Sequence, residues 1–251
     1  MNKVGIILLL ISIFPTFMTN ISNASELTIL RGNEDYPPDE MHIDGKLTGF
    51  HIELIQNAAK SIPLTVKFES VPWKRAIQML KFGKADALSY VSRNSSRENY
   101  AIFLNDNILT ESHYHFIINS QRKEKISYQG KLKDLSPYRI GVQRGYAYTE
   151  EFNQASFIHK TIFNSVIQMT SLIRSNRIDL AILTKAEYIA QKDDIIFNQI
   201  EILSPAAFSN ISYLAFSKIK NINKTAELFA KAMKDYKASD NYKTLKNKYN
   251  K

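Results

Sequence analysis

The sequence contains no cysteine, so no disulfide bond and no cysteine nucleophile can contribute to its stability or chemistry. It also lacks the Gly-x-Ser-x-Gly motif of many hydrolases and the Gly-rich phosphate loop of nucleotide-binding proteins. The histidines form no metal-binding motif: His113 and His115 would point to one face of a strand, but no third ligand is indicated. We therefore predict neither a metal site nor a cofactor, and stability must come from an apolar core.

Only one apolar run is long enough to suggest a targeting segment. Residues 1–3 are short and cationic, residues 4–18 are almost wholly apolar and contain Pro15, and residues 22–24 are small. This order is typical of a secretory signal peptide. We predict a signal peptide over residues 1–24, with an uncleaved anchor as the alternative, and a periplasmic mature chain.

The sequence carries an excess of positive charge that is spread rather than clustered. Lysine and arginine number 33 against 24 aspartates and glutamates, and only residues 231–251 are dense in lysine. Nucleic-acid binding calls for a basic stripe with interleaved aromatic residues or a known module. Neither is present, so we predict no nucleic-acid partner.

Residues 71–103 are the most informative stretch. Pro72 and a helical spacing of apolar residues predict a helix that ends at Gly83, and residues 87–91 form an apolar strand. The strand opens into residues 92–97, a loop rich in serine and arginine. Ligands of open α/β sheets bind beyond the carboxyl ends of strands, so this loop is either a candidate anion site or a solvated surface loop.

Strands and helices alternate along the rest of the chain, which favours parallel α/β sheets. The predicted strands are 27–30, 64–71, 114–118, 138–143, 157–162, 179–183 and 211–217, and the predicted helices are 52–62, 147–153, 166–173, 186–189, 226–236 and 242–249. Residues 84–88 and 177–181 have similar sequences, each between an amphipathic helix and an apolar strand. This echo predicts two similarly built lobes, in which Asp86 and Asp179 orient the connection between helix and strand.

Several short segments occur together and in a fixed order. They are 36–38 (Tyr-Pro-Pro), 44–50, 83–87, Arg97, 139–145, 177–179 and 212–218. With these segments the sequence resembles the family 3 bacterial extracellular solute-binding proteins, which are periplasmic binders of polar amino acids and related small solutes.

The resemblance implies an α/β fold of the two-lobed periplasmic binding protein type (type II), with two hinge crossovers near residues 107–112 and 205–210. Lobe 1 would comprise residues 25–110 and 211–251, and lobe 2 would comprise residues 111–210. The resemblance also implies a monomer that delivers its solute to an ABC permease or to a membrane sensor.

The same resemblance implies a set of ligand-binding residues. Tyr36 would cover the solute from lobe 1, Arg97 would pair with a carboxylate, and the turn at residues 144–148 would offer backbone N–H groups to an anion. Trp73 would line the cleft or serve as a buried structural residue. The complete set of predicted ligand-binding residues is Tyr36, Trp73, Ser89, Ser92, Arg97, Arg144, Gly145, Tyr146 and Thr184.

Thr184 departs from the family pattern. Amino-acid binders of the family carry an acidic residue here for the ligand's ammonium group, whereas this sequence has a threonine followed by Lys185. Either Glu187 takes over this role or the solute is not a standard α-amino acid, and we favour the second reading. Asp39, where family members often carry an apolar aromatic residue, points the same way.

We therefore predict a binding protein, not an enzyme, for a small polar and carboxylate-bearing solute, either an amino acid or a related compound. One alternative is an enzyme on the same fold, similar to the cyclohexadienyl dehydratases, which would need a general acid such as Glu34, Asp35 or Glu187. The other alternative is a ligand-sensing module of a membrane receptor.

Overall fold

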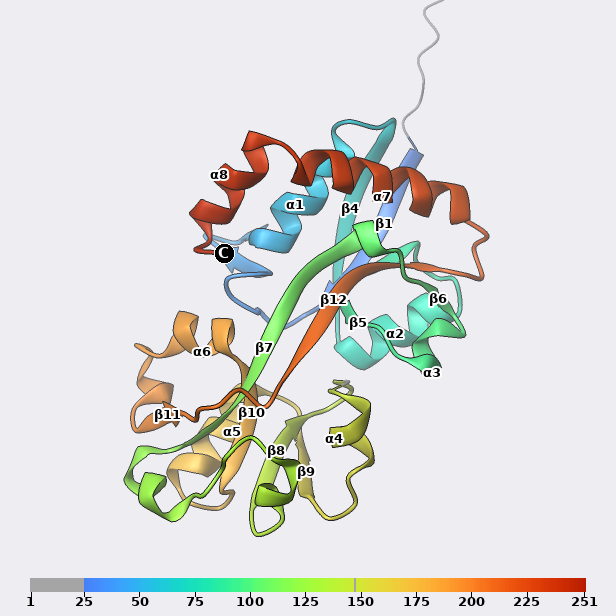
Figure 1. Ribbon diagram of the computed structural model, residues 1–251. Coiled ribbons are helices and arrows are strands. Elements are labelled where there is room, and N and C mark those ends of the chain that lie inside the picture. The colour runs from blue at the N-terminus through green and yellow to red at the C-terminus, as the bar shows by residue number, and fades with distance from the viewer. Residues whose placement is uncertain (1–24, 147) are drawn as a thin grey trace, which may run out of the picture.

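A computed structural model describes residues 25–146 and 148–251, so the predicted signal peptide lies outside the described residues. The chain forms two lobes, one above the other, joined by the long strands β7 (Ile108–Asn119) and β12 (Phe208–Ser217) (Figure 1). Within these described ranges, no helix combines the length and the apolar character needed to cross a membrane.

The upper lobe is a sheet covered by helices on both faces. Its elements are β1 (Ser25–Gly32), β2 (Met41–Ile43), β3 (Lys46–Thr48), α1 (Phe50–Ala59), β4 (Leu64–Val71), α2 (Trp73–Lys81), β5 (Ala87–Ser92), α3 (Ser95–Glu98), β6 (Ala101–Ile102), α7 (Asn223–Lys237) and α8 (Asp240–Lys248). Phe50 of α1 and Phe229 of α7 belong to the apolar cluster on one face of the sheet, and Ala76 and Leu80 of α2 belong to the cluster on the other.

The lower lobe repeats this plan. Its elements are β8 (Arg139–Gln143), α4 (Glu150–Gln154), β9 (His159–Phe163), α5 (Val166–Arg174), β10 (Leu180–Thr184), α6 (Lys185–Gln191) and β11 (Ile200–Ile202), with short 3₁₀ turns at Ser120–Lys125, Leu132–Leu135 and Ile195–Phe197 and, in the upper lobe, at Asn105–Asn107. Phe152 of α4 packs in the cluster on one face, and Met169 and Ile173 of α5 pack in the cluster on the other.

The repeated sequence segments occupy equivalent places in the two lobes. Asp86 accepts a hydrogen bond from the backbone N–H of Thr28 on β1 at 2.8 Å, and Asp179 accepts one from the backbone N–H of Arg139 on β8 at 2.8 Å. Each carboxylate thus ties the start of one strand to its parallel neighbour. The prediction that both aspartates orient the helix-to-strand connections is confirmed.

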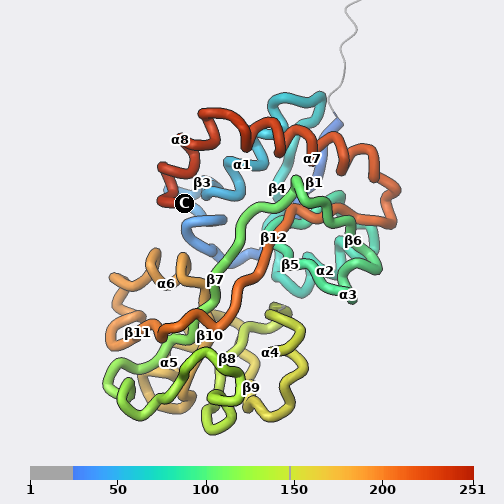
Figure 2. The backbone as a smooth tube through the Cα atoms, in the orientation of Figure 1, coloured from blue at the N-terminus to red at the C-terminus, as the bar shows by residue number. Residues whose placement is uncertain are grey.

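The two lobes share one continuous sheet with the strand order β4-β1-β5-β12-β7-β10-β8-β9. β1 pairs in parallel with β4 and β5, and β8 pairs in parallel with β9 and β10. β7 and β12 run side by side between the lobes and are antiparallel to each other (Figure 2). β12 is also antiparallel to β5, and β7 is antiparallel to β10. The parallel sheets expected from the alternation are therefore joined into a mixed sheet.

Most predicted elements are confirmed, with three local differences. Asn94 caps a short helix, α3, inside the stretch predicted as a loop, because its side chain accepts from the backbone N–H of Arg97. α4 begins at Glu150, capped by Thr149, rather than at residue 147. The short strands β6 and β11 were not predicted, since two or three residues carry too little periodicity.

The last two helices pack on the upper lobe, as predicted. Lys248 of α8 forms an ion pair with Glu53 of α1 at 2.7 Å, and the Tyr249 hydroxyl accepts a hydrogen bond from the backbone N–H of Gly49 at 3.2 Å. The upper lobe therefore combines β1 to β6 with the two C-terminal helices α7 and α8.

Candidate functional site

Predicted site residues from both lobes meet around a small cavity between them. The cavity has a volume of about 20 Å³ and is lined by Gly32, Tyr36, Glu40, Trp73, Tyr90, Ser92, Arg97, Tyr114, Tyr146 and Ser212. Such a volume holds about one water molecule. Aromatic rings and a guanidinium group therefore pack almost directly against one another.

The loop that carries Tyr36 is held by Glu40. The backbone N–H of Tyr36 donates to the Glu40 carbonyl at 2.7 Å, and the Glu40 N–H donates to the Tyr36 carbonyl at 3.0 Å. The Glu40 side chain is 1% exposed and accepts from Nε of Arg31 at 3.2 Å. This buried pairing fixes the tyrosine over the cavity.

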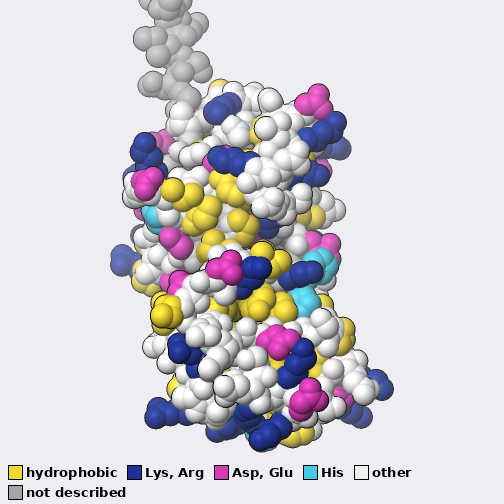
Figure 3. Space-filling model, turned by 90° about the vertical axis from the view of Figure 1, so that its left-hand side faces the viewer, with side chains coloured by type: hydrophobic (Ala, Val, Ile, Leu, Met, Phe, Trp, Pro, Cys, Tyr) yellow, Lys and Arg dark blue, Asp and Glu magenta, His cyan; other side chains and the backbone are white. Residues whose placement is uncertain are grey.

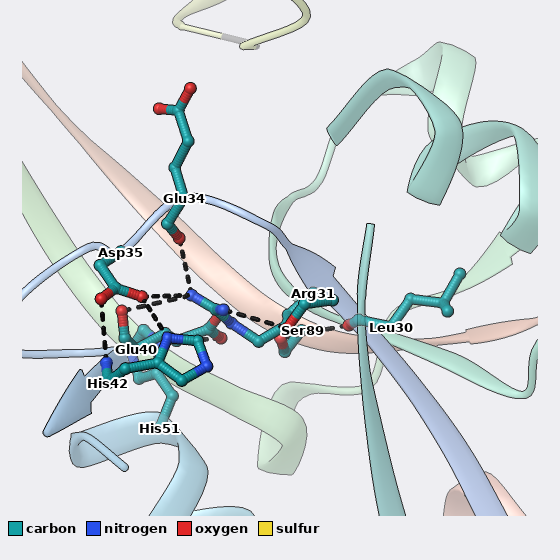
Figure 4. Close-up of polar contacts among 9 residues, drawn as sticks. Leu30, Arg31, Glu34, Asp35, Glu40, His42, His51 and Ser89 are labelled. Atoms are coloured by element: carbon teal, nitrogen blue, oxygen red, sulfur yellow. Dashed lines mark hydrogen bonds and ion pairs between the residues drawn. The ribbon is translucent and has the colours of Figure 1, made fainter. Parts of the chain in front are cut away.

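Arg31 is the centre of a buried polar cluster beneath the loop (Figure 4). Its guanidinium, 0% exposed, also donates to the Glu34 carbonyl at 2.7 Å and to the Ser70 hydroxyl at 3.2 Å. Asp35 lies 3.6 Å from it. A charge this deeply buried needs such a set of partners, because its desolvation is costly.

His51 completes this cluster from α1. Its ring nitrogens lie 3.5 Å from Asp39 and 3.7 Å from Glu40, and its ring centre lies 4.9 Å from that of Tyr90. Burial alone would raise the pKa of Glu40, but its interaction with neighbouring His51 and the charge of Arg31 outweigh burial and hold that pKa below its ordinary value. The floor of the cavity is therefore ionic.

Arg97 projects from α3 into the cavity and is 6% exposed. Its guanidinium donates to the carbonyls of Ser92 at 2.7 Å and Gly145 at 3.3 Å, and lies 6.0 Å from the Trp73 ring. Burial lowers the pKa of this guanidinium. Among the described residues no carboxylate forms an ion pair with it, so its charge is available to an anion.

Trp73 lines the cleft and makes a contact across it. Its indole N–H donates to the Gly145 carbonyl at 2.9 Å. Gly145 has φ +78°, and a Cβ there would lie 3.1 Å from Cδ1 of Trp73. The turn was expected to present N–H groups to an anion, but the group that it directs at Trp73 and Arg97 is an acceptor.

Sequence reasoning missed two tyrosines of the cavity. Tyr90 on β5 has φ +56°, and its ring centre lies 5.8 Å from that of Tyr36. Tyr114 lies on the crossover strand β7 and was read as part of an ordinary strand. Alternation along a strand shows only that a side chain is inward, and it does not separate core from cleft.

Four predicted site residues do not line this cavity, although one of them, Gly145, contacts Trp73 and Arg97 as described above. The Ser89 hydroxyl donates to the Leu30 carbonyl at 3.3 Å within the sheet. Arg144 donates to Asn164 at 2.8 Å at the outer mouth of the cleft. The Thr184 hydroxyl caps α6 and donates to Glu187 at 2.7 Å, so most of its hydrogen-bonding capacity is used inside lobe 2.

Glu187 is the acidic group of lobe 2 that faces the aromatic cluster. It is 4% exposed, and burial raises the pKa of its carboxyl, with smaller contributions from the charges of Asp39 and Glu34 across the cleft. After burial, the charge of Glu187 is the next contribution that raises the pKa of Tyr90 and of Tyr114. Glu187 is thus a buried acidic side chain three residues after Thr184, and its carboxylate accepts hydrogen bonds from the Thr184 hydroxyl and backbone N–H.

A larger cavity of about 340 Å³ opens on the side of the molecule, between α6 and residues 249–251. Figure 3 shows apolar side chains gathered at mid-height of this face, with basic, acidic and histidine side chains around them. Thr184 lines it, as do Pro38, His113, Lys185, Ile189 and Lys251. In the described part of the chain, no group of three or more potential metal ligands occurs.

Two lobes on a shared sheet, with aromatic and charged side chains between them, define a two-lobed solute-binding fold. Residues 29–251 match the model of the bacterial extracellular solute-binding proteins, family 3, and the chain belongs to this family. It is therefore a solute-binding protein, of a family described as extracellular.

Known relatives agree with this assignment. A "Probable histidine-binding protein" of Campylobacter jejuni is 28% identical over 244 residues, which are 92% of this chain and 88% of that protein.

Solved structures share the fold. A histidine kinase sensor domain with similarity to periplasmic binding proteins has a TM-score of 0.78 at 16% identity and covers 91% of this chain and 97% of its own. An ancestral arginine-binding protein bound to arginine has a TM-score of 0.75 at 20% identity and covers 90% of this chain and 99% of its own. At these identities the likeness concerns the fold alone.

Proposed function

We propose that the chain binds an amino acid with a cationic or imidazole side chain between its lobes and delivers it to an ABC permease. The observation that carries this proposal is Arg97, a buried guanidinium at the cavity without a carboxylate partner among the described residues. Arginine binds carboxylates through two parallel hydrogen bonds, so Arg97 would hold the solute carboxylate.

The other end of the cleft suits a cation. Glu187 and Glu34 bring carboxyl groups toward the cleft from the two lobes, and Gln143 of lobe 2 donates to Glu34 at 3.2 Å. The rings of Tyr36 and Trp73 add faces that attract cations. The relative named for histidine binding supports this choice of solute. With Glu187 near the cleft, we now favour an amino acid over a solute without an ammonium group.

The test is calorimetric titration of the chain with L-histidine, L-arginine, L-lysine and L-glutamine, and with histamine and agmatine, which lack the carboxylate. We expect binding of at least one basic amino acid and none of the decarboxylated amines. In Arg97→Ala the affinity should fall by about 100-fold or more, because a buried charge pair loses one partner. Undiminished binding in this variant would exclude the clamp.

A matched control is Arg93→Ala, since Arg93 is exposed and pairs with Glu98 at 2.5 Å outside the cavity. Its affinity should stay unchanged. We also propose that the chain acts as a periplasmic monomer after cleavage near residue 24, and that a membrane sensor would be the partner if no permease accepts the solute-loaded form.

A further inference from the structure

Gly145 occupies the place that a solute acceptor would need. Its carbonyl oxygen receives two hydrogen bonds from the opposite lobe, from the indole N–H of Trp73 at 2.9 Å and from the guanidinium of Arg97 at 3.3 Å. Two donors converging on one oxygen form the arrangement expected for a carboxylate. The cleft thus satisfies its anion-binding donors with its own backbone.

Tyr146 fills the space beside it. Its ring centre lies 6.1 Å from that of Tyr36 and 6.2 Å from that of Trp73, within the range of aromatic pairs. Burial is the largest cause that raises the pKa of the Tyr146 hydroxyl well above its ordinary value, and Tyr36 and Glu187 raise it further. The cavity of about 20 Å³ beside Arg97 cannot hold an amino acid, which has many times the volume of one water molecule. A second pocket of about 280 Å³ between the lobes, lined by Glu34, Gln143 and Arg144, does not include Arg97.

The approach of the turn depends on glycine. A side chain at position 145 would be strained by the positive φ and would meet the Trp73 ring at 3.1 Å. The side chain of Gln143, from the strand leading into this turn, donates to Glu34 of lobe 1 at 3.2 Å. Gln143 and Gly145 thus both connect lobe 2 to lobe 1 at this point.

We propose that Gly145 and Tyr146 act as an internal competitor, which closes the lobes without solute and must leave the cleft before solute can bind. This inference builds on the proposed function. It predicts that solute affinity is reduced by the fraction of molecules with the cleft vacated. If Gly145 and Tyr146 have left the cleft in about one molecule in ten, removal of the Tyr146 ring should raise the solute affinity about tenfold.

A simpler role for Tyr146 would give different results. If Tyr146 only forms a wall against bound solute, its removal should weaken solute binding and leave the solute-free chain unchanged. An internal competitor predicts the reverse on both counts.

Trp73 is the only tryptophan of the sequence, so its fluorescence reports directly on this contact. The experiment compares the wild type, Tyr146→Ala and Tyr146→Phe without solute, by tryptophan emission, acrylamide quenching and the radius of gyration from X-ray scattering. In Tyr146→Ala we expect emission at longer wavelength, stronger quenching and a larger radius, whereas Tyr146→Phe, which keeps the ring, should resemble the wild type.

Tyr138→Ala is the matched control, because Tyr138 is a half-buried tyrosine of lobe 2 at the other end of β8, where its hydroxyl accepts from the Ser127 N–H at 2.8 Å. Circular dichroism establishes that each variant is folded. Titration with L-histidine and L-arginine then gives the affinities, which should rise in Tyr146→Ala only.

Different measurements test the proposed function and this inference. If no variant binds either amino acid, the proposed solute class is wrong, but the solute-free emission and radius still decide the inference. Identical solute-free emission and radius in Tyr146→Ala and the wild type would overturn it, as would weaker solute binding by Tyr146→Ala.

Discussion

His51 is completely buried, and each of its ring nitrogens faces a carboxylate, Asp39 at 3.5 Å and Glu40 at 3.7 Å. Removal of the imidazole takes a neighbour from two buried carboxylates in a medium that solvates charge poorly. We expect His51→Ala to lower the free energy of unfolding by about 3–5 kcal/mol, measured by urea denaturation.

His42→Ala provides the comparison. His42 also pairs with a carboxylate, Asp35 at 2.8 Å, but both side chains are about 40% exposed. An exposed pair contributes about 0–1 kcal/mol, so this variant should stay close to the wild type. Equal losses in the two variants would contradict the ionic role of the buried cluster.

At the scale of single residues, the sequence predicted which side chains meet at the cleft better than it predicted what each of them bonds to. Tyr36, Trp73, Ser92, Arg97 and Tyr146 meet at the cavity, although their roles toward a solute stay predictions. Ser89 and Arg144 do not, because their polar groups bond to Leu30 and Asn164. A motif gives the position of a side chain along the chain, but its hydrogen-bond partners depend on segments far away in sequence.

At the scale of elements, helix α6 shows that hydrogen bonds decide the role of a predicted site residue. Thr184 is its N-cap and forms a capping box with Glu187, in which the backbone and hydroxyl of Thr184 both donate to the carboxylate. We expect Thr184→Val to destabilise the fold by about 1–2 kcal/mol while solute affinity changes less than threefold, and Thr184→Ser to restore stability. A selective loss of affinity in Thr184→Val, measured by calorimetry on folded protein, would make Thr184 a ligand residue instead.

Asp179, directly before β10, should make the stability of the lower lobe sensitive to acid. Burial opposes ionisation of Asp179, but hydrogen bonds from the side chain and backbone of Arg139 and from Arg122 outweigh it and lower its pKa to about 2. A carboxyl group whose pKa is depressed on folding stabilises the fold above its unfolded pKa near 4, and loses this contribution as the pH falls toward 2.

We expect about 2 kcal/mol from this group. Urea denaturation at pH 6 and pH 3 should therefore show a smaller pH dependence for Asp179→Asn than for the wild type. Asp240→Asn, at an exposed carboxylate paired with Lys243, should keep the wild-type dependence. An unchanged dependence in Asp179→Asn would argue against the lowered pKa.

Elements were predictable where apolar spacing was long and clear, as in α1, α5 and α7. α3 was missed because four residues cannot show helical periodicity, and its cap, Asn94, also reads as a loop residue. The mixed direction of the sheet was missed because it depends on β7 and β12, whose pairing joins segments about one hundred residues apart along the chain.

The whole molecule consists of one continuous lobe and one interrupted lobe. Residues 111–210 contain both apolar clusters of the lower lobe, whereas the upper lobe draws Phe216 from β12 and Phe229 from α7. We expect an isolated fragment of residues 111–210 to melt cooperatively by circular dichroism, and a fragment of residues 25–110 to remain unfolded. A stable 25–110 fragment would mean that α7 and α8 are an accessory layer.

The two-lobed plan itself was foreseen from the resemblance and from the echo between residues 84–88 and 177–181. What could not be foreseen is the state of closure, because Tyr146 and Trp73 meet only when two separately predicted units are placed together.

The interrupted lobe also has a consequence for biogenesis. A chain made from its amino end exposes the apolar faces of β1 and α1 throughout translation of the next hundred or more residues, until β12 and α7 arrive. Nascent protein would then depend on a holding chaperone for its first third, while its middle third can already be compact.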